Sequence, residues 1–80
     1  MDQPYVPISC AVHDELLALA TLRRECGLTV AAEDGAEEEI RGIIADVYSR
    51  GGAEYLEFRG GRTIRLDRIR RLNGQALPPA

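Results

Sequence analysis

The chain has 80 residues, and its 10 Lys or Arg and 13 Asp or Glu side chains give a net charge of −3. This length suits one small domain with a thin margin of stability, so we expect a single domain over residues 1–80. No apolar run approaches the roughly 20 residues of a membrane-spanning helix. The start of the chain lacks the basic and apolar regions of a signal peptide, so we expect a cytoplasmic protein with no membrane partner.

Charge is divided unevenly along the chain. Residues 1–49 hold ten acidic and three basic side chains, a net charge of −7, whereas residues 50–80 hold three acidic and seven basic ones, a net charge of +4. Half of all basic side chains fall in the arginine run RTIRLDRIRR, residues 62–71. Such a run is typical of nucleic-acid contacts, yet the chain as a whole is acidic.

Both ends of the chain are predicted to lack regular structure. Pro4 and Pro7 favour extended backbone, so residues 1–10 are expected to be an extended lead-in. The last residues, NGQALPPA at 73–80, are expected to be a loose tail.

A helix is predicted over residues 11–26. Asp14 and Glu15 are expected in its first turn, where acids complement the helix dipole, and Gly27 just past its end can take the left-handed cap. Four apolar residues share one face at helical spacing: Val12, Leu16, Leu19 and Ala20.

Residues 28–72 are expected to supply the strands. A short strand at 28–32 leads to the hairpin turn signal Asp34-Gly35. Residues 54–67 read as a second hairpin around Gly60-Gly61, and residues 68–72 as one more short strand or turn. Four apolar side chains of this hairpin alternate with polar ones and are predicted to face the core: Leu56, Phe58, Ile64 and Leu66.

The segment between the hairpins is ambiguous. Ile40, Ile43, Ile44 and Val47 recur at helical spacing. Against a helix, Gly42 lies in mid-segment and costs about 1 kcal/mol there relative to Ala.

Little in the sequence favours catalysis or a metal. Cys10 and Cys26 are best interpreted as two small buried side chains, and together with His13 they make only three of the four ligands of a structural zinc site. His13 is interpreted as a partly exposed helix residue, since nothing nearby marks it as a base. The glutamates at 37–39 are consecutive and cannot converge on one atom. We therefore expect a binding protein, not an enzyme, with no metal and no cofactor.

The arginine run has two interpretations. Alternating signs on the outer face of a sheet are typical of a solvated surface with cross-strand ion pairs. RNA-binding faces also interleave aromatic side chains, and here Tyr55 alone is expected on that face. The solvated face is the favoured interpretation.

The order of several short motifs resembles the Rho-binding antiterminators, the Rof family, over residues 5–70. The motif Y-x-P-I-x-C-x-x-x-D-x-L begins at Tyr5 and includes Asp14, and Asp34-Gly35 follows. The remaining matches lie further along the chain: Asp46 with Ser49-Arg50, Glu54-Tyr55-Leu56, and Arg65-Leu66-Asp67 with Ile69.

This resemblance implies a fold and a function. The fold would be a small Sm-like or SH3-like β-barrel after an N-terminal helix, with residues 40–48 as a long bent strand. Gly42 would be a bend or bulge in that strand, and a helical turn near Asp46 would be compatible with it. The function would be to bind transcription termination factor Rho over its primary RNA-binding site, which blocks RNA loading and causes antitermination.

The resemblance also implies where the partner binds. Asp14 of the helix, with Glu15 as a second charge, and the loop Ser49, Arg50, Gly51 and Gly52 are the residues expected to touch Rho. The family often has an acid three residues after the Asp, where this chain has Leu17. The acidic half of the chain suits a basic RNA-binding surface on a partner. We expect a monomer that does not itself contact RNA.

Two alternatives stay open. One is an Sm-like module that binds RNA directly through the run's arginines, Arg62, Arg65, Arg68, Arg70 and Arg71. The other is an interaction module for a different basic partner.

Overall fold

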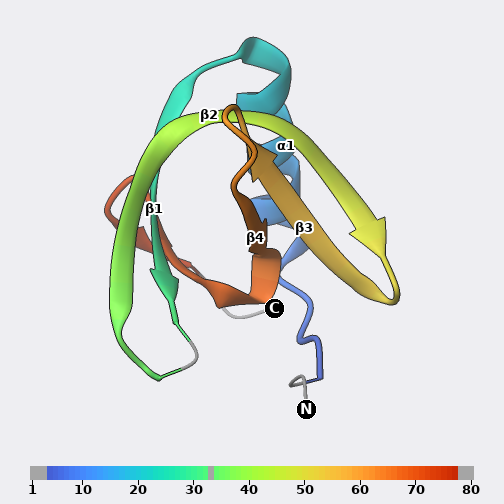
Figure 1. The fold of residues 1–80 in the computed structure, drawn as a ribbon. Helices are drawn as coiled ribbons and strands as arrows, with labels where there is room; N and C mark the ends of the chain where they lie inside the picture. The colour runs from blue at the N-terminus through green and yellow to red at the C-terminus, as the bar shows by residue number, and fades with distance from the viewer. Residues whose placement is uncertain (1–3, 33, 78–80) are drawn as a thin grey trace.

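One helix and six antiparallel strands make up the described part of the chain, residues 4–32 and 34–77 of a computed structural model (Figure 1). The strand order across the sheet is β4-β3-β2-β1-β5-β6. The elements, in chain order, are α1 (Cys10–Leu22), β1 (Glu25–Ala31), β2 (Glu37–Arg50), β3 (Ala53–Phe58), β4 (Thr63–Arg65), the 3-10 helix η1 (Leu66–Arg68), β5 (Ile69–Leu72) and β6 (Gln75–Ala76).

The predicted class, mainly β with one N-terminal helix, is confirmed. Figure 1 shows β2 arching over the molecule, so that the sheet curls around a single core. The order of the described strands leaves β4 and β6 as the two edges of the sheet, so hydrogen bonding does not close it into a barrel.

The ambiguous segment is strand β2, not a helix, and its helical spacing has a structural cause. The first half of β2 pairs with β1 and the second half with β3, and the β3 register shifts between Ile44 and Asp46. This bulge adds one residue, so inward positions that normally recur every second residue are three apart, at Ile44 and Val47. The helical turn considered near Asp46 is absent from β2, which continues as strand through that residue.

Gly42 lies in regular pairing with Cys26 and is not the bulge. A Cβ atom at Gly42 would lie 3.2 Å from Cδ1 of Phe58, a ring that is only 4% exposed. The absence of a side chain at Gly42 therefore lets a core ring approach the strand closely.

Helix α1 is shorter than predicted. Ser9 caps it, with its hydroxyl accepting a hydrogen bond from the Val12 N–H at 3.2 Å, and Arg23 takes the left-handed position expected of Gly27. Gly27 instead belongs to β1, because this strand must begin early enough to bury Cys26 beside the helix. Asp14 and Glu15 consequently lie beyond the first turn of α1.

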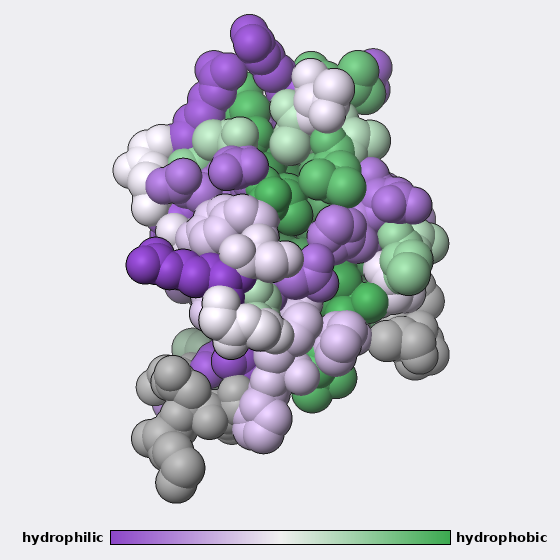
Figure 2. Space-filling view, turned by 90° about the vertical axis from the view of Figure 1, so that its right-hand side faces the viewer, coloured by the Kyte–Doolittle hydropathy of each residue, from purple (hydrophilic) through white to green (hydrophobic). Residues whose placement is uncertain are grey.

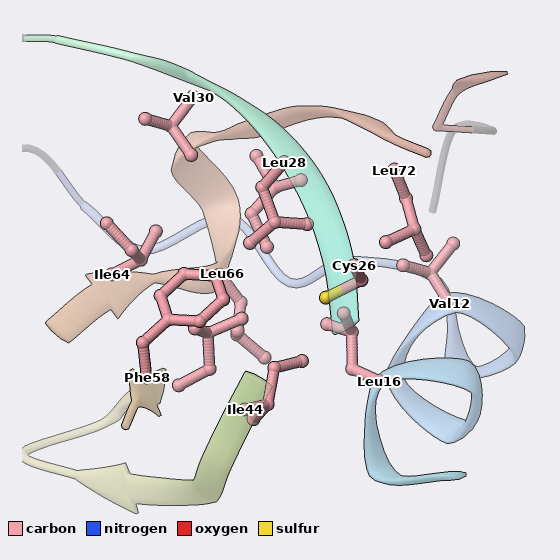
Figure 3. Close-up of a cluster of buried hydrophobic side chains, with 12 residues drawn as sticks. Val12, Leu16, Cys26, Leu28, Val30, Ile44, Phe58, Ile64, Leu66 and Leu72 are labelled. Atoms are coloured by element: carbon pink, nitrogen blue, oxygen red, sulfur yellow. The ribbon is translucent and has the colours of Figure 1, made fainter. Parts of the chain in front are cut away.

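The core is mostly aliphatic, with Phe58 as an aromatic member, and lies between α1 and the curled sheet. Figure 3 shows Val12 and Leu16 of the helix pointing toward Cys26 and Leu72 of the strands. The four alternating side chains of the predicted hairpin are all buried, which confirms their faces: Leu56, Phe58, Ile64 and Leu66. Of the two cysteines, both free thiols, Cys26 is buried as expected, and burial raises its pKa. Cys10 is exposed, so that part of the prediction is wrong.

Residues 69–72 form the short strand β5, as predicted, and the residues that follow have more structure than expected. In β5 a register shift leaves Arg70 without a partner in β1, so Ile69 and Leu72 both reach the core while two consecutive arginines stay outside it. The loose tail predicted at 73–80 is wrong for residues 73–77. They turn back as β6, and Leu77 packs against the core. Residues 78–80 lie outside the described residues.

Candidate partner-binding site

Asp14 is exposed on the outer face of α1. Val12 and Leu16 fix this orientation, because both are buried on the opposite face and pin the helix to the sheet. Cys10, one turn before Asp14, shares the outer face, which explains its exposure.

The loop expected to bind the partner together with Asp14 is a tight turn between β2 and β3. Arg50 pairs with Ala53, and the two residues between them are Gly51 at φ 59° and Gly52 at φ 83°. Positive φ at both central residues is the geometry of a two-residue hairpin, and glycine adopts it without strain. All four residues of this 49–52 turn, Ser49, Arg50, Gly51 and Gly52, are exposed.

A hydrogen-bonded cluster joins the helix to this hairpin. Nε2 of His13 lies 2.8 Å from a carboxylate oxygen of Glu54, and the Tyr5 hydroxyl donates to the other oxygen at 3.1 Å. Glu54 pairs across the hairpin with Ser49, so the cluster ties α1 to the 49–52 turn. Burial, followed by the hydrogen bond to Glu54, raises the pKa of Tyr5 to about 12.

The described part of the lead-in, residues 4–9, precedes α1 without regular secondary structure and is held by a second cluster, while residues 1–3 lie outside the described residues. Arg65 donates to both oxygens of Asp67 at 2.6 Å, and its guanidinium lies 5.7 Å from the centroid of the Tyr5 ring. The Val6 N–H donates to Asp67 at 3.1 Å. Burial alone would raise the pKa of Asp67, but hydrogen bonds from Arg65 and Val6, with the charges of Arg65 and Arg68, hold that pKa below its usual range.

Glu15 lies apart from the 49–52 turn. It lines a small hollow of about 60 Å³ together with Val12 and residues of β5 and β6. One residue on from Asp14, it is turned about 100° around the helix axis. Of the two helix acids, Asp14 is therefore the one on the open outer face, and Glu15 faces the β5–β6 hairpin.

The arginine run does not form one continuous basic surface. Arg62, Arg65 and Arg68 line an open hollow of about 460 Å³, and Arg68 and Arg70 line an adjoining one of about 310 Å³. Arg71 faces a separate hollow of about 450 Å³ beside Arg41.

Two arginines of the run make ion pairs, although neither is the cross-strand pair within the sheet that was predicted. Arg62 donates to both oxygens of Glu38, at 2.9 and 2.7 Å, and holds the pKa of that carboxyl below its usual range. Arg65 pairs with Asp67, and Arg70 donates to the Asp67 carbonyl oxygen at 2.9 Å. The register sets Arg65 opposite Tyr55 and so diagonal to Glu57.

Sequence reasoning missed an aromatic pair. Tyr48 and Tyr55 face each other across β2 and β3 with ring centroids 5.6 Å apart and planes at 22°. The helical spacing in residues 40–47 left this segment ambiguous, so no face of the sheet was predicted for Tyr48. Tyr55 also lines the hollow that holds Arg62, Arg65 and Arg68.

Within residues 4–32 and 34–77, no group of three or more His, Cys, Asp or Glu side chains is placed to hold a metal ion. Neither α1 nor the 3-10 helix η1 in this part of the chain is long and apolar enough to cross a membrane. No family model, curated protein or solved structure matches this sequence.

Proposed function

We propose that this protein binds transcription termination factor Rho over its primary RNA-binding site, keeps RNA from loading there, and so causes antitermination. The observation that carries the proposal is the contact between His13 and Glu54, at 2.8 Å. This contact holds the helix that carries Asp14 against the hairpin that carries the 49–52 turn. Glu54 thus links the two segments implicated by the family resemblance, because it contacts His13 and pairs with Ser49.

The chemistry of such an inhibitor follows from charge. A site that binds RNA presents basic side chains to phosphates. An exposed carboxylate on a rigid helix can occupy the position of a phosphate, and the acidic first 49 residues attract such a surface at longer range. In this proposal the curled sheet is an open relative of the Sm-like or SH3-like barrel.

Reversal of charge at Asp14 tests the proposal. Asp14→Arg should fold normally, because the side chain is exposed, and should weaken binding to purified Rho at least about tenfold, or roughly 1.4 kcal/mol. Binding is measured by calorimetry, and displacement of a labelled RNA from Rho is followed in parallel.

The matched control is Glu57→Arg. This substitution changes the net charge by the same amount as Asp14→Arg. Residue 57 pairs with Asp46 of the neighbouring strand, so the new arginine and Asp46 attract each other. Equal losses in both variants would mean that Rho senses only net charge, and absence of wild-type binding would refute the proposed function.

A second candidate function is direct RNA binding, favoured by the Tyr48–Tyr55 pair beside the hollow of Arg62, Arg65 and Arg68. A titration with single-stranded RNA tests it. Micromolar affinity that falls steeply with salt would support it. Arg68→Gln should then weaken binding, whereas Arg71→Gln, in the separate hollow, should not.

A further inference from the structure

The outer face of β1 carries a polar hollow that the proposed function does not use. In the register of the sheet, Thr29 lies between Arg71 of β5 and Glu39 of β2, and Gly27 pairs with Arg41. Residues that pair across strands share a face, and the intervening residues of β1 are buried in the core, so all of these face outward. They line the hollow of about 450 Å³ described above.

This hollow differs in character from the side of the molecule shown in Figure 2. That view is turned away from β1, which lies at the left in Figure 1, and it shows hydrophobic residues at the surface among hydrophilic ones. The hollow beside β1 is lined by two arginines, an asparagine, a threonine, a glutamate and two glycines. Such a lining offers charge and hydrogen bonds but little apolar contact, so it suits a polar ligand.

A glycine forms the floor of the hollow. Gly27 is buried, and a Cβ atom there would lie 3.6, 3.7 and 3.8 Å from the Cζ, Nη2 and Nη1 atoms of Arg41. These nearly equal distances mean that the guanidinium plane lies flat over the glycine. Because the N–H groups of a guanidinium lie in its plane, they point along the surface of the sheet and not into the strand.

Three side chains of the hollow have donors to spare for a ligand. Nη1 of Arg41 lies 3.6 Å from a carboxylate oxygen of Glu25, and the two side chains are 61% and 62% exposed, so this pair is weak. In the described part of the chain, the Arg71 side chain makes no ion pair or hydrogen bond. The backbone N–H of Asn73 donates to the Gly27 carbonyl at 2.8 Å, and its side-chain oxygen accepts from the Gly27 N–H at 2.9 Å. Asn73 is thereby fixed in place while its side-chain NH2 group keeps its donors.

We propose that this hollow binds the phosphate group of a sugar phosphate, which is either a free sugar phosphate or a mononucleotide. The guanidinium groups of Arg41 and Arg71 match the oxygens of a phosphate, and the amide of Asn73 adds an uncharged donor. Glu39 accepts hydrogen bonds from the hydroxyl groups of the sugar, and its negative charge disfavours a bare anion. A volume of about 450 Å³ lies within the range of small-molecule sites. The inference is independent of the proposed function, because α1 and the 49–52 turn do not line the hollow.

Titration with ribose 5-phosphate tests the site. The amide signals of Gly27 and Asn73 in NMR spectra should shift saturably and give a dissociation constant of about 1 mM or below. Arg71→Gln should weaken binding at least about tenfold, since it removes charge-assisted hydrogen bonds. Arg59→Gln is the matched control, because Arg59 is an exposed arginine outside the hollow and its loss changes the net charge equally. This control should leave the affinity within about twofold of the unmodified protein.

Further comparisons separate the roles of the lining residues and the source of the phosphate. Asn73→Asp keeps the oxygen that accepts from Gly27, so it should preserve the melting temperature, but it exchanges the NH2 donor for a negative charge and should abolish binding. Glu39→Gln should tighten the binding of inorganic phosphate and so reduce the preference for ribose 5-phosphate. Tighter binding of adenosine monophosphate than of ribose 5-phosphate would assign a mononucleotide to the hollow, and equal affinities would assign a free sugar phosphate.

Two outcomes would overturn the inference. One is the absence of saturable shifts at about 10 mM ribose 5-phosphate. The other is an equal loss of affinity in Arg71→Gln and Arg59→Gln, which would mean that the ligand senses only net charge. Neither outcome bears on the binding of Rho, so the proposed function stands or falls by its own test.

Discussion

Arg65 and Asp67 illustrate how much one pair of side chains can organise. Their side chains are only 15% and 9% exposed, and they connect β4 to η1 while holding the lead-in through Val6. A partly buried ion pair contributes mainly when its remaining hydrogen-bonding groups are satisfied, as they are here by the Val6 N–H and by the Pro4 carbonyl.

The lowered pKa of Asp67 predicts how stability responds to acid. Because the folded-state pKa lies below the unfolded value of about 3.9, the carboxylate stabilises the fold above that pH, and this contribution is lost as the pH falls through the folded pKa. Asp67→Asn should lower the free energy of unfolding by about 1 to 3 kcal/mol at pH 7. Below pH 4 the free energy of unfolding of this variant should fall less steeply with pH than that of the unmodified protein. Urea unfolding across this pH range measures both effects.

Asp14→Asn is the control, since the Asp14 side chain is exposed on the outer face of α1. This substitution should change the free energy of unfolding by no more than about 0.5 kcal/mol. An acid response of Asp67→Asn identical to that of the unmodified protein would contradict a lowered pKa.

Gly42 and Gly27 both lie in strands but differ in what a side chain would meet. A Cβ at Gly42 would press on the buried ring of Phe58, whereas a Cβ at Gly27 would meet the flexible Arg41 guanidinium at 3.6 Å. We expect Gly42→Ala to destabilise the fold by about 1 kcal/mol and Gly27→Ala to cost no more than about 0.5 kcal/mol. Thermal melting should rank them in this order, and the reverse order would mean that Phe58 moves freely.

Among the elements, helix α1 depends on its cap. Its acids lie past the first turn, so they do little for the exposed N–H groups at its start, and the Ser9 hydroxyl satisfies one of these. The α1 surface proposed to bind a partner is therefore ordered by a residue outside that surface.

Ser9→Ala should cost about 1 kcal/mol of stability, which corresponds to a fall of about 5 °C in melting temperature for a domain of this size. Ser49→Ala, an exposed serine in the 49–52 turn, should leave the melting temperature unchanged. Equal melting temperatures for the two variants would show that the cap is dispensable.

The accuracy of sequence reasoning also differs from element to element. Strict alternation predicted the faces of β3 and β4 because no bulge interrupts them. In β2 a bulge gives the apolar residues a spacing typical of a helix, which made the segment ambiguous. In β5 another bulge breaks the alternation at Arg70. The contact of His13 with Glu54 joins residues far apart in the sequence, so no local sequence pattern predicts it.

In the molecule as a whole, one hydrophobic core joins helix α1 to strands β1–β5 and to η1. Leu16 of α1, Leu28 of β1, Ile44 of β2, Leu56 of β3 and Leu66 of η1 are each 1% exposed or less. No alternative core exists among the described residues, since the buried apolar side chains form one cluster with the exception of Ala53. Damage at any of these positions should therefore spread to the whole fold.

Leu56→Ala tests this dependence. Removal of a fully buried leucine side chain should cost about 2 to 5 kcal/mol, a large share of the roughly 5 to 15 kcal/mol that stabilises a small domain. Circular dichroism should show strand and helix melting together at the lowered temperature. Survival of α1 after the sheet has melted would indicate two independent units.

The contacts between the two ends of the chain govern when this protein can fold during its synthesis. Val6 bonds to Asp67, 61 residues away, and Gly27 bonds to Asn73, 46 residues away. Strand β5, which is made late, completes the sheet beside β1 and supplies Leu72 opposite the helix. A nascent chain that ends before β5 lacks the partner that covers its first strand, so folding must wait until β5 has left the ribosome.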